Sequence, residues 1–370
     1  MVESARLYDL DSIEKFIDLV YEKGWTDGLP VFPPTPKLVG EVIGYLGRDP
    51  GEVVGAIFPG EGQATIQKIA INCVMAGCRP EYVPVVIAAV EALADPAFPL
   101  NPLQSTGGPT IMVVVSGPIV KSLGFNTREW IFGGNGGRAN ATIGRAVRLI
   151  LWNIGRAKPG ELLKGTMGHP AGWSYCIGEE QELNPWPPFQ VDMGFAAQDS
   201  AVTVIKAGAH VPLTAAAGIV SLEETFMHLA TGLSRVGSND FSINRKRSLI
   251  MTVNPSYAQL LADAGYTKRD FKKALAERAY STTEIGLSTG VFAASNEHAA
   301  GKGQDSVERF PIIADLEDLH VVVGGGWGAA RSQCAVTVGM SNVGIDLITK
   351  VIRPPKGSKW QEEKADVSSI

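Results

Sequence analysis

The chain has 370 residues, a formal net charge of -5, and 45% hydrophobic against 19% charged residues. That length allows either one large domain or two intertwined halves with a sizeable core. The acidic balance argues against general binding to nucleic acid or to anionic membranes. No apolar run has membrane-spanning length, residues 1–6 do not resemble a signal peptide, and four cysteines are too few for a disulfide framework, so we expect a cytoplasmic protein.

The first sixty residues read as helices joined by a proline-rich loop. Apolar residues recur at helical spacing over residues 10–24, which predicts an amphipathic helix. The following stretch to Thr35 contains several prolines and is expected to be extended. Thr35 and Pro36 are typical of an N-cap and a first helical position, which predicts a helix over 36–46.

The remainder, residues 61–370, alternates strands and helices, which indicates an α/β fold with a mixed or parallel sheet and flanking helices. We expect helices over 64–76, 80–93 and 140–154, and strands over 110–115, 202–206, 218–221, 250–253 and 320–323. A weak repeat of strand, polar turn, helix, glycine–aromatic pair and charged helix start begins at residue 111 and again at residue 250. It suggests two related halves, about 61–200 and 201–370, that form the catalytic region.

A glycine-rich turn before the predicted helix at 140–154 is the strongest candidate for a binding site. Such a turn exposes backbone N–H groups, and a helix N-terminus adds partial positive charge. Two arginines flank it, so the segment suits a phosphate or a carboxylate, although a plain tight connection is the alternative. The candidate substrate-binding residues are Gly134, Asn135, Gly136, Gly137, Arg138, Asn140 and Arg145.

Cys78 is a candidate nucleophile or redox thiol. It lies beside Arg79 and just before a helix that begins with proline, and both features favour a thiolate. Cys73 precedes it at a spacing that fits neither a thioredoxin-type nor a zinc-binding motif. The alternative is that both thiols are small buried residues at a helix contact.

Residues 168–186 form a long segment that is rich in ionisable side chains. A histidine and a partly buried glutamate are suited to proton transfer near neutral pH, and long loops of this kind often line active sites. The candidate catalytic residues are His169, Tyr175, Cys176, Glu179 and Glu180. Two alternatives are a solvated surface loop and a metal site formed by His169, Cys176 and Glu179.

The other histidines, His210, His228, His298 and His320, have no partner that the sequence identifies, and we expect them to be structural. A second glycine-rich stretch at residues 324–328 follows the last predicted strand, and its backbone can approach a ligand closely. We therefore add Gly325, Gly326 and Trp327 to the candidate substrate-binding residues.

Three segments together resemble a known group of proteins: residues 25–35, residues 76–81 and residues 138–145. They are similar to poorly characterised bacterial proteins related to, or encoded with, the UGSC family of thiol or selenol proteins. The resemblance extends over most of the chain, but the motif that gives the family its name is absent. It implies a reductive or lyase-type reaction and a redox thiol on a separate small subunit.

The sequence thus predicts an enzyme that acts on a small anionic organic substrate by thiol-assisted lyase or reductase chemistry with His/Glu proton transfer. A metal-dependent hydrolase or hydratase, and a non-catalytic subunit that supports a thiol-bearing partner, are the alternatives. No nicotinamide or flavin fingerprint is evident, so the cofactor stays unknown. We expect a homo-oligomer or a complex with a small thiol-bearing subunit.

Overall fold

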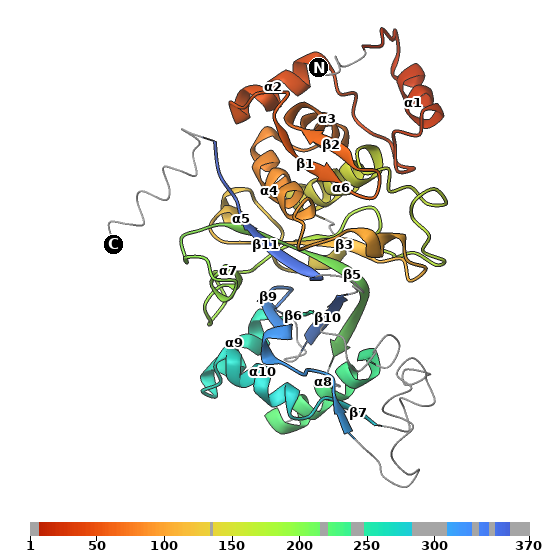
Figure 1. Ribbon diagram of the computed structural model, residues 1–370. Coiled ribbons are helices and arrows are strands. Elements are labelled where there is room, and N and C mark those ends of the chain that lie inside the picture. Colours follow the sequence, from red (N-terminus) through yellow and green to blue (C-terminus); the bar gives the residue numbers. More distant parts are fainter. Residues whose placement is uncertain are drawn as a thin grey trace, which may run out of the picture.

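A computed structural model describes residues 7–133, 136–214, 221–237, 248–282, 309–327, 333–339 and 345–355. Seven strands form one mixed sheet with helices on its outer faces, which confirms the α/β expectation (Figure 1). The strands of this sheet are β3 (Thr110–Ser116), β4 (Cys176–Gly178), β5 (Ala201–Thr214), β6 (Leu249–Val253), β9 (Leu319–Val323), β10 (Gln333–Gly339) and β11 (Leu347–Val351).

The other elements fall into an N-terminal and a C-terminal group. The first contains α1 (Ile13–Glu22), α2 (Pro36–Leu46), β1 (Val53–Ile57), β2 (Gly62–Thr65), α3 (Ile66–Ala76), α4 (Val83–Leu93) and α6 (Arg138–Asn153). The second contains α8 (Leu222–Gly237), α9 (Pro255–Asp263), α10 (Lys268–Ala276), β7 (Tyr280–Thr282) and β8 (Arg309–Pro311). Short helices occur at α5 (Ile119–Ser122), α7 (Phe189–Asp192), η1 (Pro80–Tyr82), η2 (Asn101–Gln104), η3 (Ile131–Gly133) and η4 (Leu316–Asp318).

The long strand β5 belongs to both halves of the sheet. Its first residues, 201–207, pair with β3 on one edge, while residues 201–205 pair with β11 on the other. Its last residues, 207–214, pair with β10, and the register of β10 shifts between Val338 and Gly339. A register shift of this kind bends a sheet. One layer therefore consists of β4, β3, β11 and the start of β5, and the other of the end of β5 with β10, β6 and β9.

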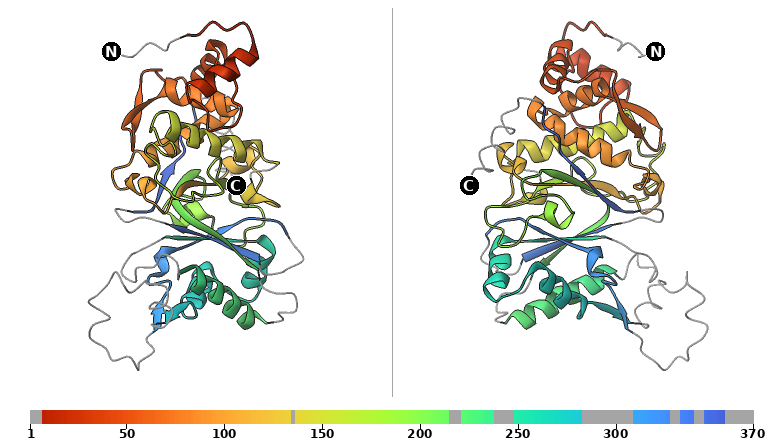
Figure 2. Two further views of the ribbon diagram at one scale, coloured as in Figure 1. Left: turned by 90° about the vertical axis from the view of Figure 1, so that its right-hand side faces the viewer. Right: turned by 60° about the vertical axis from the view of Figure 1, so that its left-hand side comes forward.

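Alternating side chains make three apolar cores from these two sheet layers. Val113 and Val115 of β3 face outward and pack in a core with α3, α4 and α6. Met251 and Val253 of β6 face outward on the other side, in a core with α8, α9 and α10. A third core lies between the layers and includes Met112, Val114, Ile177, Ile205, Ile250 and Val322. The molecule is consequently a stack of helices, sheet, sheet and helices (Figure 2).

Several predicted elements are confirmed with small changes of boundary. Helix α2 covers the predicted range, and the Thr35 hydroxyl accepts the Leu38 amide hydrogen as expected of an N-cap. Helix α3 begins at Ile66 because residues 62–65 belong to β2, which the sequence did not predict. Helix α6 begins at Arg138, two residues earlier than predicted.

The charged helix start that we expected in the first copy of the repeat, the copy that begins at residue 111, was wrong. Asn126 instead accepts a hydrogen bond from the Arg128 amide and donates one to the Glu129 carbonyl, and these bonds close a compact loop. The predicted strand at 218–221 lies outside the described residues except for Ser221, which directly precedes α8. Residues 202–206 form part of the much longer β5.

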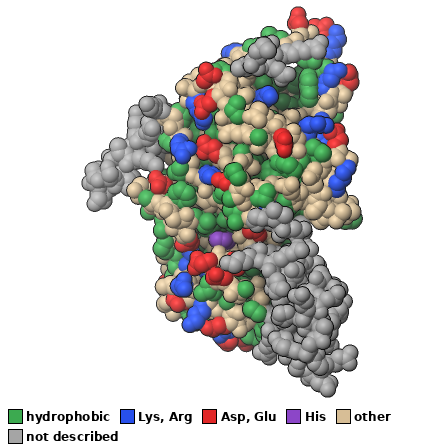
Figure 3. All heavy atoms as spheres, viewed as in Figure 1, with side chains coloured by type: hydrophobic (Ala, Val, Ile, Leu, Met, Phe, Trp, Pro, Cys, Tyr) green, Lys and Arg blue, Asp and Glu red, His purple; other side chains and the backbone are tan. Residues whose placement is uncertain are grey.

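The proposed boundaries at residues 60 and 200 stay predictions. One apolar core combines Val20 and Val39 from the first sixty residues with Ile69 and Ile143 from the region beyond. Within the described ranges, no helix has both the length and the apolar character needed to cross a bilayer. Basic and acidic side chains are interspersed over the described part of the face that Figure 3 shows.

Candidate functional site

Tyr175 lies at the centre of a hydrogen-bonded cluster between the two sheet layers. Its side-chain oxygen is 3.0 Å from His210 Nδ1 and 2.8 Å from Thr337 Oγ1. The His169 ring stacks on the Tyr175 ring with 5.7 Å between centroids. Phe132 closes one side, with its centroid 4.2 Å from that of His210. Residues from the 168–186 segment, β5, β10 and η3 thus meet at one point.

Burial determines the protonation of this cluster. It raises the pKa of Tyr175, which keeps the phenol protonated, and it lowers the pKa of both His169 and His210. The Ala171 amide donates to His169 Nδ1 over 3.1 Å, so the proton of the neutral His169 ring resides on Nε2. His210 Nδ1 faces the Tyr175 hydroxyl, which is able either to donate or to accept a hydrogen bond. The His210 ring therefore holds its proton on either nitrogen without losing this hydrogen bond.

The first turn of α6 packs directly against the segment that carries Tyr175. The Asn140 side chain is fully buried, and its Nδ2 donates to the carbonyls of Asn126 and Cys176 over 2.9 and 3.4 Å. The Ser174 hydroxyl donates to the Ala141 carbonyl over 2.9 Å. Gly136 and Gly137 lead into this turn, and Gly137, the N-cap residue, makes no side-chain capping bond. Gly134 and Asn135 lie outside the described residues.

The two candidate arginines are bound within the chain. Arg138 donates from Nε and Nη2 to the Gly77 carbonyl at the end of α3, over 3.2 and 2.9 Å. Arg145 forms a two-point ion pair with Asp27, with distances of 3.2 and 2.9 Å, and the Asp27 side chain is only 2% exposed. These contacts fix α6 to its neighbours, and any anion at this turn would rely on backbone N–H groups.

The four cysteines are free and buried. Cys78 donates from Sγ to the Thr142 carbonyl over 3.3 Å, which places it between α3 and α6. Burial raises the pKa of Cys73, Cys176 and Cys334. Cys176 begins β4 directly after Tyr175, and its environment therefore favours the thiol over the thiolate.

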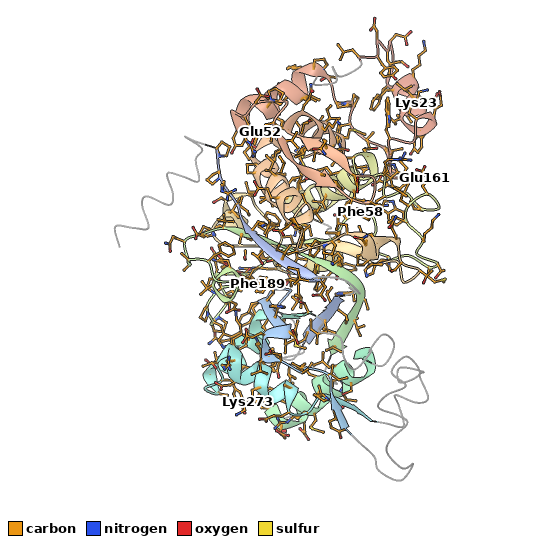
Figure 4. The ribbon with its side chains drawn as sticks, viewed as in Figure 1. Lys23, Glu52, Phe58, Glu161, Phe189 and Lys273 are labelled. Atoms are coloured by element: carbon orange, nitrogen blue, oxygen red, sulfur yellow. The ribbon has the colours of Figure 1, made fainter. Side chains whose placement is uncertain are left out.

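Glu179 is almost completely buried and anchors the segment that follows β4. Its oxygens accept from the Phe189 amide over 3.0 and 2.8 Å and from Asn184 Nδ2 over 3.1 Å. Phe189 lies at the interface of the two sheet layers, close to the middle of the molecule (Figure 4). Burial raises the pKa of Glu179 to about 7, against the opposing effects of the Lys268 charge and of hydrogen bonds from the Phe189 amide and Gln181.

Glu180 and the glycines after β9 meet at a second place, at the other end of β4. Glu180 accepts from the Thr127 hydroxyl over 2.6 Å and from Arg128 Nε over 3.2 Å. The Gly325 amide donates to the Thr127 carbonyl over 2.9 Å. Gly326 lies against the Glu129 side chain, and Trp327 is 55% exposed. The candidates Glu180, Gly325 and Gly326 therefore contact the loop that ends at Trp130, and Trp327 follows them along the chain.

The structure thus brings His169 and Tyr175 together in one cluster and Glu180, Gly325 and Gly326 together at another place. Other candidates make separate contacts: Cys78, Arg138, Arg145 and Glu179. The structure also adds members that the sequence did not identify. His210 and Thr337 complete the Tyr175 cluster, although His210 was expected to be structural. Neither has a local sequence signal, because only the register of β10 on β5 brings them together. Among the described residues, no three His, Cys, Asp or Glu side chains are arranged to hold a metal ion.

A scan against models of known protein families found no match for this chain, and a search of curated proteins found no related sequence. The resemblance to UGSC-related proteins consequently stays a prediction.

Proposed function

We propose that this protein is an enzyme that transfers protons to and from a small anionic organic substrate, in a lyase-type reaction. The supporting observation is the position of the Tyr175 hydroxyl within hydrogen-bonding distance of both His210 and Thr337, with His169 stacked on the same ring. A general acid or base needs a titratable group that is held in place by a second group, and this cluster has that composition.

In this proposal His210 is the group that exchanges the proton. Its Nε2 takes a proton from the substrate while the Tyr175 hydroxyl accepts a hydrogen bond from Nδ1. Nε2 then gives this proton to the leaving group or to water, while Nδ1 keeps its own proton and its hydrogen bond to the Tyr175 hydroxyl. His169, neutral and protonated on Nε2, donates a hydrogen bond to developing negative charge on the substrate. The lowered pKa of both rings suits them to act in the neutral form.

No side chain in the described ranges caps the start of α6, and this open start supports an anionic substrate. A 16-residue helix has unpaired N–H groups and partial positive charge at its start, and its first turn contacts the residues next to Tyr175. Cys176 belongs to the same region, where burial raises the pKa of its thiol, so the proposal does not use it as a thiolate. A cytoplasmic setting, and association with a second copy or a thiol-bearing subunit, belong to this proposal as well.

Proton exchange with solvent tests the proposal even while the substrate is unidentified. The protein is incubated in D2O with a panel of small carboxylic and phosphorylated acids, and deuterium incorporation at carbon is followed by proton NMR. We expect at least one acid to exchange, and Tyr175→Phe and His210→Asn to slow the exchange by about 10²–10⁴-fold.

Two matched variants serve as controls. Tyr257 is as buried as Tyr175 but belongs to the outer core of α8–α10, and His228 is exposed on α8. Tyr257→Phe and His228→Asn should exchange like the unmodified protein. Equal exchange by Tyr175→Phe and Tyr257→Phe would refute the role of the Tyr175 cluster.

A further inference from the structure

An open hollow borders the loop between α5 and η3, apart from the Tyr175 cluster. Its volume is about 610 Å³, which is within the range of sites for small organic ligands. The lining residues are Gly124, Phe125, Asn126, Glu129, Trp130 and Gly136. The hollow thus presents two aromatic rings, one carboxylate and the open backbone of two glycines.

Trp130 contributes little to the stability of the fold. Its side chain is 76% exposed, so most of the indole is not removed from water on folding. Its φ of 61° lies in the left-handed region, which is unfavourable for a bulky residue and natural for glycine. Neither the backbone nor the side chain of Trp130 therefore favours the folded state, and the ring remains available to a ligand.

The rest of the loop is held firmly. Asn126 Nδ2 donates to the Glu129 carbonyl over 2.8 Å, directly before Trp130. The Thr127 hydroxyl donates to buried Glu180, and the Thr127 carbonyl accepts from Gly325. These bonds connect the loop to both sheet layers. Glu129 and Trp130 consequently keep their positions before a ligand arrives, which reduces the entropy lost on binding.

Glu129 determines the sign of the charge that the hollow accepts. Its carboxylate is exposed beside Gly326 and makes no ion pair with any residue in the described ranges. An indole face attracts cations through its quadrupole, and a carboxylate attracts them through its charge. An anion would be repelled by Glu129.

From this combination we infer that the hollow binds an organic cation, such as an alkylammonium or guanidinium group, between the Trp130 ring and the Glu129 carboxylate. The apolar part of the ligand packs against Phe125. The hollow shares Gly136 with the start of α6, but this inference uses none of His169, Tyr175, His210 and Thr337, and its test measures binding alone.

The test compares three probes of equal chain length: n-butylammonium, n-butanol and butyrate. Ligand-observed NMR at low ionic strength should give an affinity for n-butylammonium about tenfold above that for either other probe, a difference that corresponds to about 1.4 kcal/mol. Trp130→Ala should weaken n-butylammonium binding at least about tenfold. Glu129→Gln should abolish the preference for the cation over the alcohol. Trp173→Ala and Glu161→Gln, which alter an exposed tryptophan and an exposed glutamate elsewhere, should bind like the unmodified protein.

A further variant distinguishes a binding role of Trp130 from a structural one. Trp130→Gly removes the ring and suits the left-handed backbone, so its melting temperature should equal or exceed that of the unmodified protein while n-butylammonium binding is lost. A lower melting temperature for Trp130→Gly would overturn the inference. Equal binding of butyrate or n-butanol and n-butylammonium, or unchanged binding by Trp130→Ala, would also overturn it.

Discussion

The contact between α6 and β4 is so tight that a glycine-to-alanine substitution in α6 should destabilise the protein. In most helix interiors the same substitution is stabilising. Gly144 lies in the middle of α6 and faces the segment 174–176. A Cβ atom at Gly144 would lie 2.4 Å from Ser174 Oγ, 2.9 Å from the Tyr175 amide nitrogen and 3.1 Å from Cys176 Cβ. The Ser174 side chain is able to rotate away from the added Cβ atom, but the Tyr175 nitrogen belongs to the backbone and can move only if the backbone shifts.

The magnitudes decide the sign of the effect. Replacing glycine by alanine in a helix interior stabilises a protein by about 0.8–1.0 kcal/mol. Against this gain, rotation of Ser174 breaks its hydrogen bond to Ala141, at about 0.5–1.5 kcal/mol, and overpacking against backbone costs about 1–3 kcal/mol. We expect Gly144→Ala to lower the free energy of unfolding by about 1–3 kcal/mol.

Gly44 in α2 provides the control, because it is an exposed helical glycine with no atom within 4 Å of an added Cβ. Gly44→Ala should raise the free energy of unfolding by about 0.8–1.0 kcal/mol. Urea denaturation followed by tryptophan fluorescence compares the two variants, and the midpoint reports stability if the slope is unchanged. Gly144→Ala should also displace Tyr175 and slow the deuterium exchange proposed above. If Gly144→Ala is as stabilising as Gly44→Ala, the packing argument for the position of Tyr175 is refuted.

Three further predictions concern buried polar groups. Glu179 has a folded-state pKa of about 7 against an ordinary value of 4.5, so the folded state binds more protons and the free energy of unfolding falls as the pH rises from 4.5 to 7. Denaturation at pH 5 and pH 8 should show that the free energy of unfolding of Glu179→Gln, relative to that of the unmodified protein, is higher at pH 8 than at pH 5 by up to about 3 kcal/mol. A difference between the two proteins that does not change with pH would contradict this. Arg145→Met should destabilise the protein by about 3–5 kcal/mol because it leaves the Asp27 carboxylate buried and unpaired. The double variant Arg145→Met/Asp27→Asn should recover part of this loss in the same denaturation assay. Tyr257→Phe should be neutral or stabilising by up to about 1 kcal/mol, because the buried Tyr257 hydroxyl has no partner among the described residues, and a clear loss of stability would reveal one.

Local sequence signals predicted several of the individual elements but not the strands β1, β2, β4, β10 and β11. The Thr35–Pro36 pair fixed the start of α2, and the apolar β-branched run at residue 110 identified β3, because capping and strand formation depend on neighbouring residues. The sequence did not predict the double-layered arrangement, since that depends on β5, which has 14 residues where the sequence predicted a strand only over 202–206. It also offered no reason to join Asp27 to Arg145, which are 118 residues apart.

The candidate site shows the same limit. His169 and Tyr175 were identified because a glycine- and proline-rich segment with several ionisable residues is unlike a packing element. His210 and Thr337 were not identified as candidates, because each lies on a strand whose sequence pattern indicates only burial. Trp130 and Glu129 lay in a segment that was assigned to a helix. The compact loop depends on two hydrogen bonds of the Asn126 side chain, and many asparagines occur where no such loop forms.

The shared strand β5 has a consequence for how the chain is made. During synthesis β3 leaves the ribosome before β5 and is available to cover one edge of its first half. The strands that cover its other edge, β10 and β11, follow more than one hundred residues later. A long strand with an open edge is a template for pairing with other chains, and distant pairings form slowly. The nascent protein therefore has a period of exposure to aggregation that ends only when its C-terminal strands arrive, so slower growth at low temperature or chaperone supply should increase the yield of folded protein.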